Sequence, residues 1–156
     1  MKKLFKHISK IRHINVFIYV MKNYQKIDLT TIINDIKIEN LKNDNKKFYI
    51  IKDLQLVHQS FLYNKVFLMR QFGEKGPVIG DCYTKPTHRG KSIYPSVINY
   101  IAKKHFETRN NPIFVIVGQN NKPSIKGIEK AGFIKYASLK AKRWMWIYLS
   151  KQIIMN

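Results

Sequence analysis

The stretch YTKPTHRGKSI, residues 83–93, decides how the chain folds. An apolar run from Pro77 to Thr84 leads into it and predicts a strand, and after Pro86 the apolar residues recur at helical spacing. Between them lies a basic turn with Arg89, Gly90 and Lys91. A helix start offers unpaired N–H groups and a positive dipole end, so this turn suits a phosphate or pyrophosphate. By these residues alone, a polar turn that merely caps a helix is the simpler interpretation, and a phosphate site is the alternative.

A second stretch, NKPSIKGIEKAGF at residues 121–133, predicts another helix. It follows the apolar run Ile113 to Val117, which is typical of a strand buried on both faces. Asn121 is a suitable N-cap, and Gly132 stands where a helix end favours a left-handed residue. We therefore expect a helix from about Lys122 to Ala131.

The remaining segments predict a sheet around these two helices. His13 to Lys22 predicts a strand, and Asp28 to Leu41 has isoleucines at helical spacing and predicts a helix, followed by an exposed loop over Glu39 to Lys47. An antiparallel meander is expected over Phe48 to Ile51, Leu54 to Tyr63, Val66 to Phe72 and Pro77 to Thr84. Phe133 to Leu139 and Arg143 to Leu149 should form a closing hairpin. The fold class is thus α/β of the α+β kind, a mixed and mostly antiparallel sheet flanked by helices, with residues 1–156 as a single domain.

The net charge of the chain indicates that its binding partners are anionic. The chain carries a net charge of +20, and from residue 83 onward 14 Lys and Arg face only Glu107 and Glu129. Such a surface attracts nucleic acid, coenzyme phosphates or nucleotide sugars, and charge alone does not choose between them.

Cysteine and hydropathy exclude several other classes of protein. Cys82 is the only cysteine, so an intramolecular disulfide and the cysteine-rich zinc patterns are ruled out, and we expect no metal. The apolar run Val16 to Met21, within the basic segment Met1 to Asn23, is too short for a membrane span and has no cleavage site after it. We expect a cytoplasmic protein.

Taken together, in this order and about 30 residues apart, the two stretches resemble the GNAT superfamily of N-acetyltransferases over roughly residues 78–149. The pieces that match are Arg-Gly-Lys-x-Ile at residues 89–93 and Asn-x-x-Ser-Ile…Glu-Lys-x-Gly-Phe at residues 121–133. The resemblance implies that the turn binds the pyrophosphate of acetyl-CoA or another acyl-CoA and that the second stretch lies along the pantetheine arm. The coenzyme-binding residues it implies are Cys82, Tyr83, Thr84, His88, Arg89, Gly90, Lys91, Ser92, Ile93, Asn121, Ser124 and Lys130.

Two positions depart from the family's pattern. Ser92 and Tyr94 stand where the turn usually has small residues, and a similar Arg-Gly-Lys-x-Ile-Tyr-Pro turn in members that resemble surface-polysaccharide enzymes points to an amino-sugar acceptor. Ile128 occupies the place of a tyrosine thought to protonate the leaving thiolate, so Tyr136 or Tyr148 would have to replace it unless water does so.

The mechanism that the resemblance implies is direct attack of an amine on the thioester in a ternary complex. Backbone N–H groups near Cys82, Tyr83 and Thr84 would polarise the carbonyl. His58, which shares a strand face with Ser60, is a candidate general base, and Asp81 could bind the substrate ammonium. Alternatively, His58 is a surface histidine or a hydrogen-bonded core histidine, and Asp81 is a partner in a surface salt bridge.

Three functions are consistent with the charge, the motifs and the resemblance. The first is transfer of an acyl group to a small anionic acceptor, most simply a nucleotide-linked amino sugar. The second keeps the fold and acetylates aminoacyl-tRNA, as toxin-like members of the superfamily do, and the third is a non-catalytic nucleic-acid-binding module. A homodimer is left open by the sequence.

Overall fold

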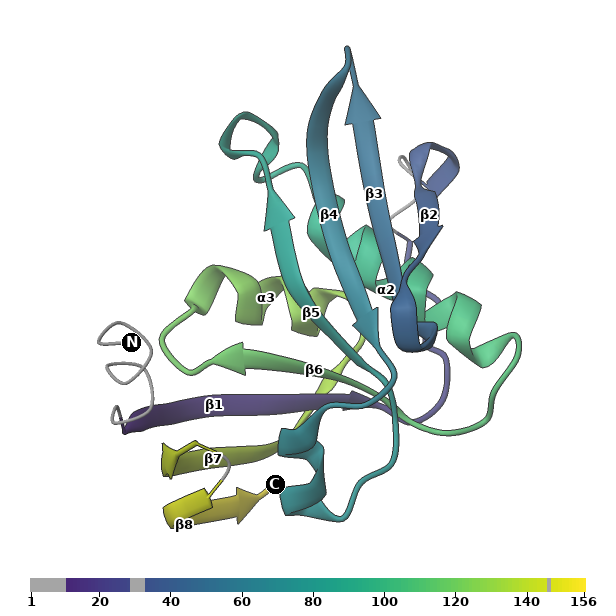
Figure 1. Cartoon of the computed structure of the whole chain (residues 1–156). Coiled ribbons are helices and arrows are strands. Elements are labelled where there is room, and N and C mark those ends of the chain that lie inside the picture. Colours follow the sequence, from purple (N-terminus) through teal and green to yellow (C-terminus); the bar gives the residue numbers. More distant parts are fainter. Residues whose placement is uncertain (1–10, 29–32, 146) are drawn as a thin grey trace.

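The computed structural model describes residues 11–28, 33–145 and 147–156, and all eight strands described there join one sheet in the order β2-β3-β4-β5-β6-β1-β7-β8 (Figure 1). Every neighbouring pair is antiparallel except β5 with β6, which is parallel. The strands are β1 (Arg12–Met21), β2 (Lys37–Asn40), β3 (Lys46–Lys52), β4 (Gln55–Tyr63), β5 (Val78–Thr84), β6 (Ile113–Gly118), β7 (Ile134–Trp144) and β8 (Ile147–Met155). The helices are α2 (Ile93–Phe106) and α3 (Lys122–Lys130), with 3₁₀ turns η1 (Ile33–Asp35), η2 (Lys42–Asp44), η3 (Phe67–Phe72) and η4 (Pro86–His88). The expected α+β fold class is confirmed.

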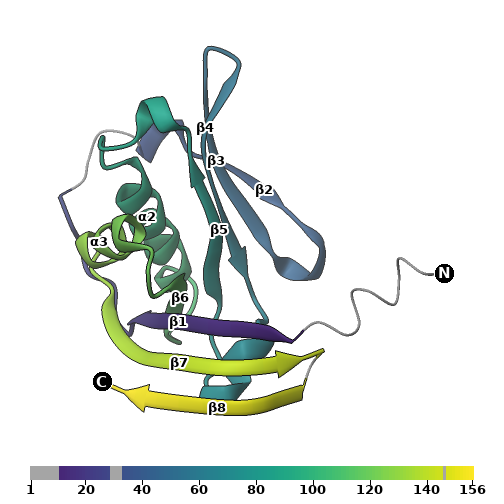
Figure 2. The same cartoon turned by 90° about the vertical axis from the view of Figure 1, so that its left-hand side faces the viewer.

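The two faces of the sheet are covered by different elements. Alternate residues of β1 separate them, because Tyr19 and Met21 join the larger core under α2 and α3, whereas Ile18 and Val20 join a smaller core that contains Met69 of η3. Figure 2 shows α2 and α3 together on one side of the sheet. One face therefore carries both long helices, and the other carries η3 over its β1–β6–β7 part.

The sheet splits at its parallel pair. β5 and β6 are paired only at Val78 with Phe114 and at Ile79 with Val115. Beyond Ile79, β5 stays with β4 as far as Thr84, while β6 stays with β1, and the two strands diverge (Figure 1). We call this opening between β5 and β6 the splay. It leaves the β6-facing edge of residues 80–84 without a strand partner.

Two predicted elements are wrong. Asp28 to Leu41 was expected to be a helix, but the structure has η1 and β2 within residues 33–40, and residues 29–32 lie outside the described ranges. Pairing of Ile38 with Phe48 on β3 outweighs the weak helical spacing. The loop predicted over Glu39 to Lys47 is shorter than expected, because its ends belong to β2 and β3. Only residues 41–45 connect the two strands, closed by a hydrogen bond of 2.8 Å from the Leu41 amide to the Asn45 carbonyl.

Val66 to Phe72, predicted as a strand, is the 3₁₀ turn η3 ended by Gly73 in a left-handed conformation (φ 70°). Its apolar side chains pack on the smaller core instead of extending the sheet. The strand expected over His13 to Lys22 and the helix expected over Lys122 to Ala131 are present within one or two residues, and the helix expected after Pro86 is α2. The closing hairpin is present too, but its first strand runs five residues further than predicted, to Trp144, and its second strand ends at Met155.

The described residues contain no helix that is long and apolar enough to span a membrane. Of the segment Met1 to Asn23, residues 1–10 lie outside the described ranges, and the apolar run Val16 to Met21 is part of β1. Nor does the described part of the chain hold a group of three or more His, Cys, Asp or Glu side chains placed to bind a metal ion.

Candidate functional site

A β-bulge at Asp81 shapes the edge of the splay. Gln59 pairs with Tyr83 and Phe61 pairs with Gly80, so Ser60 on β4 stands opposite both Asp81 and Cys82. Asp81 adopts a left-handed backbone (φ 47°). Because of the extra residue, the Cys82 side chain packs toward the core under α2, while the exposed Asp81 carboxylate accepts a hydrogen bond from the Tyr63 hydroxyl.

On the α2 side of this bulge lies a chain of hydrogen-bonded polar groups. His58 Nδ1 is 2.7 Å from Thr84 Oγ1, and His58 Nε2 is 2.8 Å from Ser60 Oγ. The Ser60 hydroxyl donates to Cys82 Sγ at 3.1 Å, and Cys82 in turn donates to the Gly80 carbonyl at 3.4 Å. One arrangement of protons satisfies all these contacts: the Thr84 hydroxyl donates to Nδ1, and Nε2–H donates to Ser60.

Burial fixes the charge states in this network. His58 is 0% exposed, and burial lowers its pKa to about 4, so the imidazole is neutral near pH 7. Burial also raises the pKa of Cys82 to about 12, which keeps the thiol protonated. The predicted base His58 thus has no direct access to a substrate, and its route to the surface passes through the half-buried Thr84 hydroxyl.

The basic turn after β5 leaves the start of α2 open. Ser92, the N-cap of α2, has a left-handed backbone (φ 57°) and makes no capping hydrogen bond with its side chain. Its hydroxyl instead accepts from Lys130 Nζ at 2.8 Å, which joins the end of α3 to the start of α2. Arg89 is exposed and donates from Nε to the Thr84 carbonyl at 3.1 Å. Cations from two elements therefore surround first-turn amides that no side chain caps.

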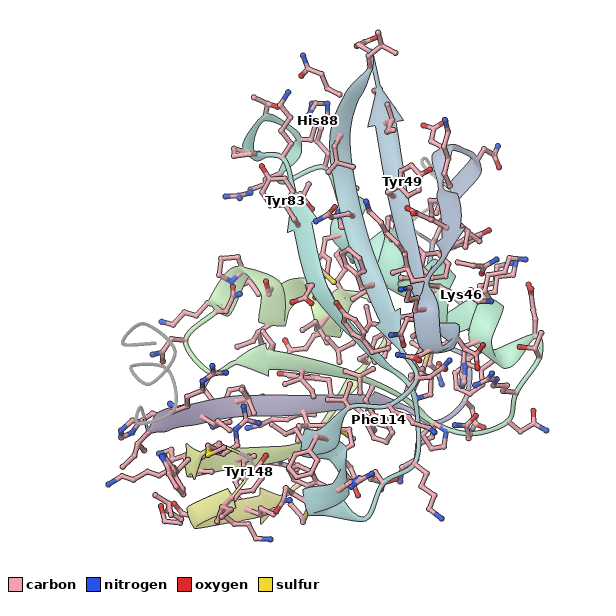
Figure 3. All side chains as sticks on the ribbon, viewed as in Figure 1. Lys46, Tyr49, Tyr83, His88, Phe114 and Tyr148 are labelled. Atoms are coloured by element: carbon pink, nitrogen blue, oxygen red, sulfur yellow. The ribbon has the colours of Figure 1, made fainter. Side chains whose placement is uncertain are left out.

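The other residues expected here lie around the same turn. Gly90 is left-handed (φ 77°), Lys91 is exposed, and His88 Nδ1 lies 3.0 Å from Thr87 Oγ1. Figure 3 shows Tyr83 and His88 near the upper end of β5. Ile93 is buried at the beginning of α2. At the start of α3 the Asn121 side chain accepts from the Ser124 amide at 3.3 Å, so both residues make a helix cap.

Tyr94 is a site residue that the sequence prediction missed. Its ring lies against α3: a Cβ added to Gly127 would be 2.7 Å from Tyr94 Cδ1. Its hydroxyl forms a hydrogen bond with the Cys82 side chain, and burial raises its pKa well above the usual range. Ile128, by contrast, is 0% exposed in the core. Tyr94 and Gly127 complement each other, because the large ring at the start of α2 faces a residue of α3 that has no side chain.

Tyr136 and Tyr148 are not brought to this network. The Tyr136 hydroxyl donates to Glu74 Oε1 at 2.5 Å, which together with burial raises its pKa to about 12. Its ring lies 6.0 Å from that of Phe114, in the smaller core on the η3 side. Tyr148 stacks on Phe67 of η3 at 6.3 Å. Both tyrosines therefore lie on the face of the sheet opposite His58 and Cys82.

Comparison with known proteins agrees with this geometry. The sequence model of the family described as FR47-like protein matches residues 68–145, which is 78 of the 156 residues. A solved structure described as an acetyltransferase from the GNAT family of Colwellia psychrerythraea is similar, with a TM-score of 0.58 and 16% identity over 84% of this chain. The chain covers 56% of the length of that structure. None of the curated proteins has a significant sequence match.

The structural match, at 16% identity, supports the fold alone. The family match includes β5, the basic turn, α2, β6 and α3. The same elements form the splay and its surroundings. The chain belongs to the FR47-like family, and its fold is that of the GNAT superfamily.

Proposed function

We propose that the chain is an N-acyltransferase that moves an acetyl or other acyl group from acyl-CoA to an amine by direct attack in a ternary complex. The observation that carries this proposal is the splay between β5 and β6 beside a basic, uncapped helix start. In the proposed complex the thioester arm lies along the splay, and the coenzyme phosphates bind at the turn. Among the described residues no other helix start combines these two features.

The described residues fit the coenzyme on two grounds. First, the uncapped amides of α2, with Arg89, Lys91 and Lys130 around them, offer hydrogen bonds and positive charge to a pyrophosphate. Second, the unpaired edge of residues 80–84 can hydrogen-bond the pantetheine amides and polarise the thioester carbonyl. Cys82, Tyr83 and Thr84 would act through their backbone.

The proton balance assigns a role to Tyr94. When the amine attacks, the C–S bond breaks, the sulfur takes the electron pair, and one proton leaves the nitrogen. The Tyr94 hydroxyl already donates toward a sulfur atom at the bulge, and Ile128 has no proton to give. We infer that Tyr94 protonates the leaving thiolate and is reprotonated by the proton released from the amine through water.

Calorimetric titration with acetyl-CoA at moderate salt tests the proposal. Micromolar binding is expected for the unaltered chain, and Arg89→Glu should weaken it about tenfold or more because it reverses a charge at the pyrophosphate. Arg70→Glu makes the same charge change on η3 and is the matched control. If neither acetyl-CoA nor longer acyl-CoAs bind, the acyltransferase proposal is wrong and the non-catalytic nucleic-acid-binding function takes its place.

For the acceptor we propose a small anionic amine, most simply a nucleotide-linked amino sugar. This rests on the resemblance of the basic turn and on the surplus of Lys and Arg after residue 83. A cytoplasmic location, a single domain over residues 1–156 and a homodimer remain predictions of the same kind.

A second candidate, acetylation of aminoacyl-tRNA, is favoured by one specific observation. β1, β6, β7 and β8 are adjacent in the sheet and contain no Asp or Glu. A phosphate backbone suits the exposed lysines of β7 and β8, which are Lys135, Lys140, Lys142 and Lys151. Turnover of aminoacyl-tRNA in preference to nucleotide sugars would establish this candidate.

A further inference from the structure

The face of β3, β4 and β5 that points away from α2 carries a group of aromatic rings. We call Tyr49, Phe61, Tyr63 and Tyr83 the aromatic platform. The strand register places Tyr49, Gln59 and Tyr83 side by side in one row, and Lys47, Phe61 and Gly80 in the next. The rings of Phe61 and Tyr63 are stacked, with centroids 6.0 Å apart and an interplanar angle of 8°.

No described helix covers this platform. Phe48, Ile50, His58 and Ser60 alternate with its residues and are buried on the α2 side. In Figure 1, α2 lies behind β3 and β4, and Figure 3 shows Tyr49 and Tyr83 in front, on β3 and β5. Tyr83 is 44% exposed, and the other three rings are half-buried. Four rings on one uncovered patch of a sheet are more than scattered surface residues, and they indicate a binding surface.

The platform already holds a cation. Lys47 Nζ lies 5.3 Å from the ring centroid of Tyr49 and 5.9 Å from that of Phe61. This is the distance at which an ammonium group is attracted to the negative face of an aromatic ring. The rings therefore offer a favourable environment for an ammonium group as well as for an apolar one.

Asp81 adds a carboxylate at the edge of the platform next to the splay. The bulge turns this side chain toward the platform face, where the Tyr63 hydroxyl donates to it. The Tyr63 ring lies over Gly80, since a Cβ added to Gly80 would be 3.5 Å from Tyr63 Cε2. Asp81 is also the residue before Cys82, whose side chain points to the α2 side. The bulge thus places the Asp81 carboxylate on one face of the sheet and the hydrogen-bonded network of His58, Ser60 and Cys82 on the other.

We propose that the aromatic platform together with Asp81 is the acceptor site, and that it takes an amine carried on a saturated ring, that is, an aminated sugar. The C–H face of such a ring packs on an aromatic side chain, and its ammonium group pairs with Asp81 at the edge of the splay. After it loses one proton to water, the neutral amine is within reach of a thioester there. An open-chain amine has no flat face for the platform. A nucleic-acid strand could stack bases on the rings, but it would bring a run of phosphates against Asp81 and, beside Lys47, Glu39 of β2, whereas an amino sugar brings its ammonium group to Asp81. This inference rests on the proposed acyltransferase function and names the substrate class of that site.

The test measures release of free CoA thiol from acetyl-CoA with a panel of amines. The panel contains glucosamine, a nucleoside-diphosphate amino sugar, spermidine, a lysine peptide and an aminoacyl-tRNA. We expect the two aminated sugars to be the best acceptors. Asp81→Asn should raise the acceptor KM about tenfold or more, because it removes a charged partner while asparagine still tolerates the left-handed backbone. Tyr83→Leu should raise it about threefold through loss of ring contact.

Controls separate this inference from the proposed function. Phe67→Leu removes an exposed ring on η3, away from the platform, and should leave the acceptor KM unchanged. The calorimetric affinity for acetyl-CoA should be the same in the unaltered chain, in Asp81→Asn and in Phe67→Leu. If the unaltered chain does not bind acetyl-CoA, the proposed function is wrong. If it binds acetyl-CoA but prefers spermidine, the peptide or the tRNA, or turns over none of the panel, only the acceptor site is wrong. Unchanged acceptor KM in both Asp81→Asn and Tyr83→Leu would overturn it equally.

Discussion

The His58 side chain is buried between the sheet and α2, and both ring nitrogens are hydrogen-bonded, so its charge state is coupled to folding. Its pKa is about 4 in the folded chain and near 6.5 when unfolded. Above pH 6.5 both states hold a neutral ring and stability is full. As the pH falls from 6.5 toward 4, the unfolded state takes up the proton first, and the free energy of unfolding should drop by about 3 kcal/mol.

Urea unfolding at pH 7.5 and pH 4.5 measures this loss, and His58→Gln should lack most of it. The pKa of His105 is also lowered by burial and contributes with the same sign, but it does so in both chains. The difference between the chains therefore isolates His58. Equal losses in the two chains would show that His58 is not the titrating group.

The Tyr94 hydroxyl can be tested without knowing the acceptor. If it donates to the coenzyme sulfur, CoA should bind about tenfold more tightly than desulfo-CoA at pH 9, where much of the thiol is ionised. Tyr94→Phe keeps the ring against Gly127 and should abolish this preference. Tyr100→Phe, on the same helix and in the same core, is the matched control and should retain it. A preference that survives in Tyr94→Phe would assign the proton to another donor.

At the scale of elements, α2 and α3 pack closely because Gly127 has no side chain. Alanine favours a helix by about 1 kcal/mol over glycine, so Gly127→Ala would stabilise a free helix. Here its Cβ would be 2.7 Å from Tyr94 Cδ1, and we expect a net loss of about 1–3 kcal/mol. Removing the ring should relieve the clash, so Gly127→Ala should cost nothing further in a Tyr94→Ala background. Calorimetric or urea unfolding of the double-mutant cycle measures the coupling, and additive losses would contradict it.

The elements that could be predicted from the sequence are those with strong local patterns. α3 has its cap at Asn121 and its end at Gly132, and α2 has four fully buried apolar residues at helical spacing, Val97, Ile98, Ile101 and Ala102. β2 and η3 were missed because short segments take their structure from the partner they pair with or pack on. The bulge at Asp81 depends on the register between two strands, which no single strand encodes. The basic turn of the site was therefore predictable, whereas the platform and the Tyr94 contact depend on tertiary packing.

At the scale of the whole molecule, exposed lysines lie on strands that contain no Asp or Glu. Lys140 and Lys142 on β7 are both exposed, and they pair with Asn15 and His13 of the neighbouring strand β1. All nine acidic residues lie outside β1, β6, β7 and β8. Coenzyme binding at the turn needs only local cations, so this distant charge is either without a partner or contacts a polyanion.

Binding of a fluorescent single-stranded RNA at increasing salt distinguishes the two. If the β1–β7–β8 surface contacts phosphates, the affinity should fall steeply as salt increases. Each lost phosphate contact lowers the slope of log K against log salt by about 0.7, so the double variant Lys140→Glu/Lys142→Glu should lower it by about 1.4. Lys42→Glu/Lys46→Glu makes the same charge change beside Asp44, at the β2–β3 end of the sheet, and should leave the slope unchanged. Equal effects of the two double variants would mean that RNA responds only to net charge, and the tRNA-acetylating function would lose its support.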